Sequence, residues 1–247
     1  PAQKADIRYR ALGQGPATVR LTATPANFSG RRYQADFPVT LESGAHSVQL
    51  TLPMPKAKLW WPVGTGKPHL YTIRVALRDE NGLMDTAVTR TGLRKIVEQP
   101  DNKGWLINDK RLFIKGSNYI GSPWLSTMTR EKYRRDLRLV EAMNANAIRV
   151  HGHVAGRALY DVADEMGMMI WQDVPLQWGY NNSAAFTENA VRQTREMIEQ
   201  FGNSPAIIVW GGHNEPPWNS PWMEKRFPDW NKDLNRELTQ KVADPLP

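Results

Sequence analysis

The chain has 247 residues, of which 40% are hydrophobic and 23% charged, as in ordinary globular proteins. It contains no cysteine, which excludes disulfides, thiolate zinc sites and cysteine nucleophiles but leaves the compartment open. The net charge of +7 comes from residues 1–98, because acidic and basic residues balance over residues 99–247. These basic residues are scattered, so we expect no nucleic-acid partner. No apolar run approaches the roughly 18 residues of a membrane span, so we expect no membrane either.

Residues 1–98 predict a β-sandwich domain. Apolar and polar residues alternate with a period of two over residues 17–23, 47–52 and 71–77. Turn signals rich in glycine, proline and asparagine separate these stretches. Short strands at such spacing favour an antiparallel sandwich of immunoglobulin-like type.

Residues 99–247 predict a second domain in which strands and helices alternate. It opens with a β-hairpin over residues 105–114, turning at Asn108-Asp109. We predict strands over residues 113–116, 147–150, 168–171 and 206–210, and helices over residues 129–143, 157–166, 184–201 and 230–242. The strands are apolar throughout, as in a parallel sheet covered on both faces. No glycine-rich phosphate loop follows the first strand, and the four βα units amount to the first half of a TIM (β/α)8 barrel.

Polar residues follow all four predicted strands. In such a barrel the chemistry lies at the C-terminal ends of the strands. The residues expected there are Asn118 after the first strand, Arg149 and His151 on the second, Asp173 and Trp178 after the third, and Asn214 and Glu215 after the fourth. Ionisable and amide groups that converge at one edge are what a polar active site requires.

Glu215 is the candidate catalytic residue. Its carboxyl group sits on a rigid strand end, where it can be held against a glycosidic oxygen; the alternative is a loop carboxylate that caps a helix. Asn214 can bond a sugar 2-hydroxyl or serve as a turn residue. Arg149 can orient a carboxylate or form a structural ion pair. Asp173 can accept hydrogen bonds from sugar hydroxyls or cap a loop, and Trp178 can stack on a sugar ring or pack in the core.

His151-Gly152-His153 suggests a metal site. Two histidines at i and i+2 on a strand point to the same side, as in metal-dependent hydrolase barrels. A third ligand would have to come from elsewhere in the chain, so we favour residues that line a pocket. We therefore expect no metal and no cofactor, and keep a metal-dependent hydrolase using His151 and His153 as an alternative.

Three segments resemble the family 2 glycoside hydrolases, which include β-galactosidases, β-glucuronidases, β-mannosidases and exo-β-glucosaminidases. They are residues 146–151, residues 167–173 and residues 202–215, the last ending in His213-Asn214-Glu215. Residues 115–118 and the stretch from Trp60-Trp61-Pro62 to Leu70-Tyr71 are also similar. The resemblance covers nearly the whole chain. Residues 171–173 are most similar to the mannosidase and glucosaminidase branch.

The resemblance implies an immunoglobulin-like domain over residues 1–98 and a barrel half over residues 99–247. It also implies retaining hydrolysis of terminal β-linked sugars, with Glu215 as acid/base and a second glutamate as nucleophile at the end of a seventh strand. That strand is missing, and the chain begins at a proline without methionine, so we expect a fragment that is inactive alone. In a bacterium we expect a periplasmic or secreted protein.

Two departures from the family pattern leave the sugar open. His151-Gly152-His153 stands where an aromatic residue and glycines are usual, and Ser204 replaces a histidine or arginine. A non-catalytic carbohydrate-binding barrel is a second alternative, which a strand-seven glutamate in the complete gene would disfavour. A half barrel also exposes an unpaired strand edge, so self-association is expected.

Overall fold

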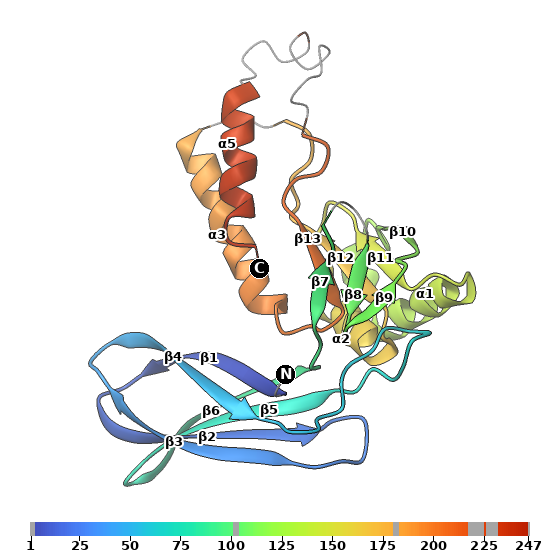
Figure 1. Cartoon of the computed structure of the whole chain (residues 1–247). Helices are drawn as coiled ribbons and strands as arrows, with labels where there is room; N and C mark the ends of the chain where they lie inside the picture. The colour runs from blue at the N-terminus through green and yellow to red at the C-terminus, as the bar shows by residue number, and fades with distance from the viewer. Residues whose placement is uncertain (1–2, 101–103, 180–182, 217–224, 226–231, 247) are drawn as a thin grey trace.

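The computed structural model describes residues 3–100, 104–179, 183–216, 225 and 232–246. Figure 1 shows a β-sandwich formed by the N-terminal part of the chain, with a unit of strands and helices above it. Two helices, α3 (Ala184–Phe201) and α5 (Lys232–Ala243), run side by side at one flank of that unit.

The sandwich consists of two antiparallel sheets. The larger has the order β3-β2-β5-β6, and the smaller pairs β1 with β4. The strands are β1 (Lys4–Leu12), β2 (Gly15–Pro25), β3 (Tyr33–Leu41), β4 (Ala45–Pro53), β5 (Tyr71–Asp79) and β6 (Gly82–Thr91). Alternate residues of β2 and β5, among them Leu21 and Ile73, share one buried core with Leu52 of β4. The predicted immunoglobulin-like sandwich is confirmed, and its three predicted strands correspond to β2, β4 and β5.

A small three-stranded sheet of order β7-β8-β9 follows, formed by β7 (Ile96–Glu98), β8 (Trp105–Ile107) and β9 (Lys110–Leu112). The predicted turn at Asn108-Asp109 is correct. Both residues have positive φ, 51° and 65°, as a tight two-residue hairpin turn requires. Because β7 pairs with β8, hydrogen bonds cross the predicted domain boundary between residues 98 and 99, which stays a prediction.

The second unit is a four-stranded parallel sheet of order β10-β11-β12-β13. Its elements alternate as β10 (Gly116–Tyr119), α1 (Arg130–Ala142), β11 (Ala147–Val150), α2 (Arg157–Met166), β12 (Met169–Asp173), α3, β13 (Ile207–Gly211) and α5, with a short 3-10 turn η1 (Leu125–Thr127) before α1. Val150, Ile170 and Ile207 of the strands share a buried core with Leu159 of α2. This is the first half of a TIM barrel, as the sequence predicts.

The helix ends follow their sequence signals. Thr129 and Ser183 cap α1 and α3, because each side chain accepts a hydrogen bond from a backbone N–H of the first turn. Gly167 ends α2 with φ 77°, and a Cβ there would lie 2.9 Å from the carbonyl oxygen of Trp61. A residue with a side chain would therefore be strained and would collide with the sandwich-side loop.

The first barrel strand is shifted from its predicted position. The sequence predicts residues 113–116, but the ladder with β11 runs from Gly116 to Tyr119, and Phe113 is 80% exposed. Close approach explains the start, because a Cβ on Gly116 would lie 2.4 Å from the carbonyl oxygen of Ala147. The apolar pair Phe113-Ile114 therefore precedes the strand.

Trp60 joins the sandwich to the barrel half. Its ring is fully buried in the core that the parallel strands and their helices form. Its indole N–H donates to the backbone oxygen of Asp164 at 2.8 Å. Arg94 adds two bonds from its guanidinium to the carbonyl oxygens of Pro205 and Ile207, both 2.5 Å. The sandwich is thereby fixed to the N-terminal end of β13. None of the helices in the described residues is long and apolar enough to cross a membrane.

Candidate active site

Alternate side chains of β11 and β12 point to opposite faces of the parallel sheet. Arg149 and Trp171 are register partners on one face, and Asp173 lies two residues beyond Trp171 on the same face. The Arg149 guanidinium sits 5.0 Å from the centre of the Trp171 ring. This face carries the candidate site, whereas the opposite face packs against the helices.

Arg149 connects Asp173 with Asn214. Its Nε lies 3.1 and 3.0 Å from the two carboxylate oxygens of Asp173, and its Nη2 lies 2.9 Å from Oδ2. The same Nη2 donates to Asn214 Oδ1 at 2.8 Å. The backbone N–H of Gly152 also donates to Asp173 at 3.1 Å. Three strand ends are thus held together by one guanidinium, which forms an ion pair with Asp173.

Gly211 makes room for this arrangement. It is the register partner of Asp173 at the end of β13. A Cβ at position 211 would lie 2.5 Å from Asp173 Oδ1 and 2.7 Å from Trp171 Nε1. The glycine therefore lets the Asp173 carboxylate lie flat against the neighbouring strand.

Glu215 lies just beyond β13, with an exposed side chain. The Trp178 indole N–H donates to Glu215 Oε2 at 3.1 Å. Both residues have positive φ, 47° for Glu215 and 59° for Trp178. Such a backbone conformation is uncommon for residues with a side chain and is often found at functional sites.

A short parallel bridge aligns the two loops that carry these residues. Gln177 pairs with Asn214, the N–H of Trp178 donates to the Asn214 oxygen at 3.1 Å, and the N–H of Asn214 donates to the Leu176 oxygen at 2.9 Å. His213 adds a side-chain contact, with Nε2 2.7 Å from the Trp178 carbonyl oxygen. The sequence singled out Trp178 but assigned His213 no role, because this contact joins residues far apart in the chain.

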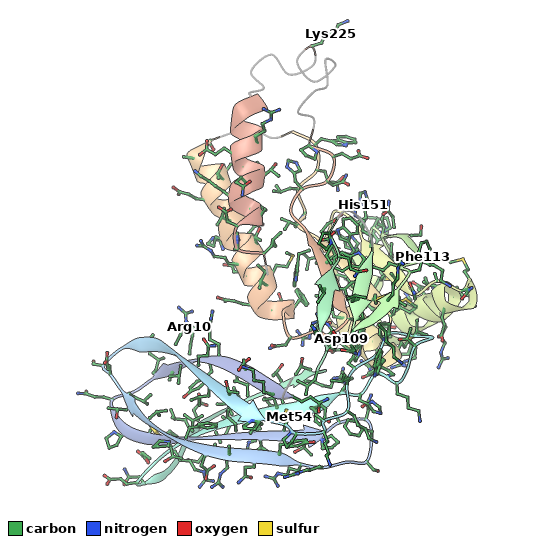
Figure 2. The ribbon with its side chains drawn as sticks, in the orientation of Figure 1. Arg10, Met54, Asp109, Phe113, His151 and Lys225 are labelled. Carbon is green, nitrogen blue, oxygen red and sulfur yellow. The ribbon has the colours of Figure 1, made fainter. Side chains whose placement is uncertain are left out.

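The remaining predicted residues lie at the same edge. Asn118 is exposed on β10 and is the register partner of Arg149. His151 follows β11, and its Nδ1 lies 3.4 Å from Asp173 Oδ2 without a hydrogen bond. Figure 2 shows His151 at the end of the parallel sheet away from the sandwich, whereas Asp109 lies at the end nearer to it.

The metal alternative gains no support from geometry. His153 Nδ1 contacts the backbone oxygen of His151 at 3.1 Å, and the Asp173 carboxylate beside His151 is engaged by Arg149. Within the part of the chain that the structure describes, no group of three His, Asp or Glu side chains is arranged to hold a metal ion.

Gln172 and Ser204 lie outside the site. Gln172, the neighbour of Asp173, is fully buried on the helix side and accepts from the Tyr160 hydroxyl at 2.6 Å. Ser204 precedes β13, at the opposite end from Glu215, and its hydroxyl donates to Asp164 Oδ1 at 2.5 Å. The departure at Ser204 therefore lies at the opposite end of β13 from Glu215.

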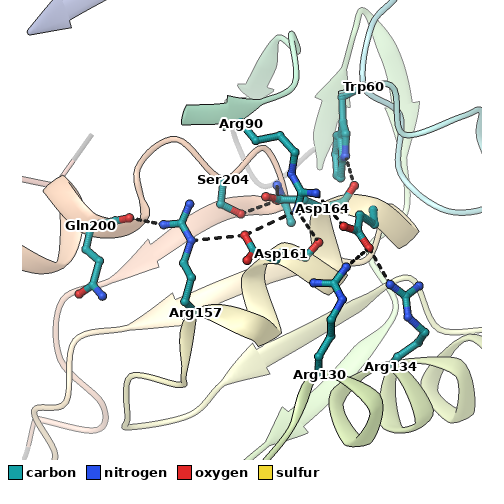
Figure 3. Close-up of polar contacts among 11 residues, drawn as sticks. Trp60, Arg90, Arg130, Arg134, Arg157, Asp161, Asp164, Gln200 and Ser204 are labelled. Carbon is teal, nitrogen blue, oxygen red and sulfur yellow. Dashed lines mark hydrogen bonds and ion pairs between the residues drawn. The ribbon is translucent and has the colours of Figure 1, made fainter. Parts of the chain in front are cut away.

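Figure 3 shows the junction with the sandwich as a group of charged side chains. Glu165 accepts hydrogen bonds from Arg90, Arg130 and Arg134. Burial alone would raise the pKa of Glu165, but these bonds outweigh it, and the pKa lies below its usual value. Burial raises the pKa of Asp164 to about 7, against the effect of its bonds from Ser204 and the backbone of residue 206. Arg90 of β6 links the sandwich to Glu165 of α2, whereas the bonds of the Asp164 carboxylate lie within the barrel half.

Curated relatives of this chain include glycosidases of fungi and bacteria. It is 32% identical over 185 residues to beta-mannosidase B of Thermothelomyces thermophilus, covering 70% of this chain and 21% of that protein. It is 29% identical over 187 residues to a beta-glucuronidase of Bacteroides fragilis, covering 72% of this chain and 26% of that protein. The chain thus spans about a fifth to a quarter of the length of these relatives.

Solved structures share its fold from end to end. A beta-D-mannosidase from Dictyoglomus thermophilum matches with a TM-score of 0.83 and 26% identity, over 100% of this chain and 33% of that one. A beta-glucuronidase from Bacteroides uniformis matches in fold with a TM-score of 0.74 and 24% identity, over 98% of this chain and 29% of that one. The family description "Glycosyl hydrolases family 2" matches residues 3–94, and "Glycosyl hydrolases family 2, TIM barrel domain" matches residues 99–236. The chain belongs to the glycosyl hydrolases of family 2.

Proposed function

We propose that this chain carries the acid/base half of the active site of a retaining β-glycosidase. The observation that carries the proposal is the position of Glu215, beyond the C-terminal end of β13 and next to Asn214, which Arg149 anchors. Family membership supports the same reading. Glu215 is the general acid that protonates the leaving-group oxygen, and then the general base that activates water.

Asn214 contributes a hydrogen-bond donor, its side-chain amide nitrogen. Its Oδ1 accepts from Arg149, so the amide Nδ2 is the group left to donate to a substrate. A sugar 2-hydroxyl is the matching acceptor, and this bond strengthens as the oxocarbenium-like transition state forms. Arg149 and Asp173 keep the amide in that orientation and need not touch the sugar.

We assign the nucleophile to no residue in the described part of the chain. Retaining chemistry requires a second carboxyl group about 5–5.5 Å from the first. That group attacks the anomeric carbon while Glu215 donates its proton, and water then releases the sugar. We therefore expect this chain alone to lack hydrolytic activity.

The names of the relatives suggest the substrate classes to test, namely terminal β-mannosides and β-glucuronides. The experiment assays the complete gene product on nitrophenyl β-glycosides that differ only in the sugar, with Glu215→Gln beside it. Hydrolysis of one of them by the parent and its loss in the variant is the expected result. Equal activity of the two proteins would refute the assignment of Glu215.

We also propose that the isolated chain self-associates. In the described sheet β10 and β13 are the edge strands, which leaves backbone groups open to pairing. Large apolar side chains are exposed before β10 and at the C-terminal end of α1, including Phe113 at 80%, Leu139 at 60% and the C-cap residue Met143 at 70%. Sedimentation velocity tests this: a monodisperse monomer that melts cooperatively would contradict it.

A further inference from the structure

The contact between Trp178 and Glu215 determines how the carboxylate is presented. The indole N–H can only donate, and it bonds Oε2 at 3.1 Å. One such bond restricts the rotation of the carboxylate and engages Oε2 rather than Oε1. Trp178 is 52% exposed, and its backbone N–H donates to the Asn214 oxygen at 3.1 Å.

His213 adds a restraint on the carbonyl group of the same residue, Trp178. Its Nε2 lies 2.7 Å from the Trp178 carbonyl oxygen, and its Nδ1 lies 2.8 Å from the Thr239 hydroxyl of α5. A carbonyl oxygen only accepts, so the proton is on Nε2, and Nδ1 of the neutral ring accepts from Thr239. Burial lowers the pKa of His213 and so favours this neutral form. The ring therefore joins α5 to the loop that carries the tryptophan.

We propose that His213 is a positioning residue, which holds Trp178 so that its indole N–H orients the Glu215 carboxylate. The proposal rests on the proposed function only for its catalytic consequence. The contacts of His213 with Trp178 and Thr239 are present whatever the catalytic role of Glu215. Because Glu215 delivers its proton to the leaving group, the exposed face of Trp178 lies on the leaving-group side of the site.

The first test measures the NMR signal of the Trp178 indole N–H directly. In the chain labelled with 15N at the indoles, Trp178→Phe identifies the Trp178 N–H signal, and Glu215→Leu, which has no side-chain acceptor, tests its partner. His213→Leu should move that signal toward the signal of Trp124, which is 74% exposed. His213→Gln keeps an amide donor near the Nε2 position and should keep most of the original shift. Thr239→Val, which removes only the hydroxyl partner, should move it less than His213→Leu.

The same spectrum contains its own control for folding. The indole of Trp60, fully buried and bonded to Asp164, lies at the junction with the sandwich. Its signal should stay in place in every variant, which separates a local change from unfolding. If His213→Leu leaves the Trp178 signal unmoved while Trp60 is intact, the proposal is wrong. An unmoved Trp178 signal in Glu215→Leu would likewise refute the contact.

The second test measures the catalytic consequence in the complete gene product. His213→Leu should lower kcat by roughly 100-fold, as misplacement of a reacting group does, with a smaller change in KM. His213→Gln should recover part of this loss. If the signals move as expected while Glu215→Gln keeps full activity, the proposed function fails and the positioning contact stands. If Glu215→Gln is inactive but His213→Leu has normal kcat, the positioning role fails.

Discussion

Arg149 and Asp173 form an ion pair across neighbouring strands, with Arg149 Nη2 2.9 Å from Asp173 Oδ2; the Asp173 side chain is 2% exposed and that of Arg149 27%. The same guanidinium extends to Asn214, next to Glu215. Stability and site geometry therefore depend on one side chain.

Replacement of Arg149 should destabilise the fold. Arg149→Met leaves the Asp173 carboxylate buried without its cation, and breaking such a pair costs about 3–5 kcal/mol. Arg149→Lys should recover only part of this, because an ammonium group cannot bond both Asp173 and Asn214 in the fork geometry of arginine. Urea unfolding of the chain measures both changes. Adding Asp173→Asn to Arg149→Met should restore stability, and a loss below about 1 kcal/mol in Arg149→Met would contradict the account.

Two adjacent glycines provide a matched test of the space around Asp173. Gly211→Ala places a methyl group 2.5 Å from Asp173 Oδ1, so the carboxylate or the strand must move. Gly212→Ala meets its nearest atoms at 3.6 Å, an ordinary contact. We expect Gly211→Ala to lower the unfolding midpoint by an amount equivalent to about 1–3 kcal/mol, and Gly212→Ala to change it little. If both substitutions change the unfolding midpoint equally, Asp173 does not crowd position 211.

Asp164 should make stability depend on pH. Its folded pKa of about 7 lies above the usual value of 3.8, so the folded protein binds this proton more tightly than the unfolded chain. Its contribution to stability is therefore fully present below about pH 4 and declines as the pH rises to about 7. The slope in this window is at most about 1.4 kcal/mol per pH unit.

Asp164→Asn removes that titration while keeping an oxygen for Ser204 and Ala206. The variant should gain stability relative to the parent as the pH rises from 4 to 7, because groups common to both proteins cancel in the difference. Urea unfolding at several pH values in this window gives the curve. A flat difference between the two proteins would contradict a raised pKa.

Much of the fold could be predicted because its signals are local. Period-two alternation identifies β2 and β5, and Asn108-Asp109 matches the backbone that a tight hairpin needs. The gathering of the candidate site residues could be predicted as well, since parallel strands bring their C-terminal ends together. The start of β10 could not, because Gly116 is selected by the approach of Ala147, which is distant in sequence.

The unpredicted parts of the site depend on tertiary contacts. The side chains of the neighbours Gln172 and Asp173 point to opposite faces of the sheet. Only the register of β12 with β11 determines which of them shares the face of Arg149. His213 reaches Trp178 and Thr239 across three separate segments. Ser204 has a typical loop composition around it, and only the fold brings it to Asp164.

The most direct test of the central claim varies the leaving group. The complete gene product and its Glu215→Gln variant would be compared on glycosides of one sugar, with dinitrophenol, nitrophenol and a simple alcohol as leaving groups. If Glu215 protonates the leaving group, the variant should lose most activity on the alcohol glycoside and least on the dinitrophenyl glycoside, which departs without a proton. An equal loss on all three leaving groups, or no loss, would contradict the assignment of Glu215 as the acid.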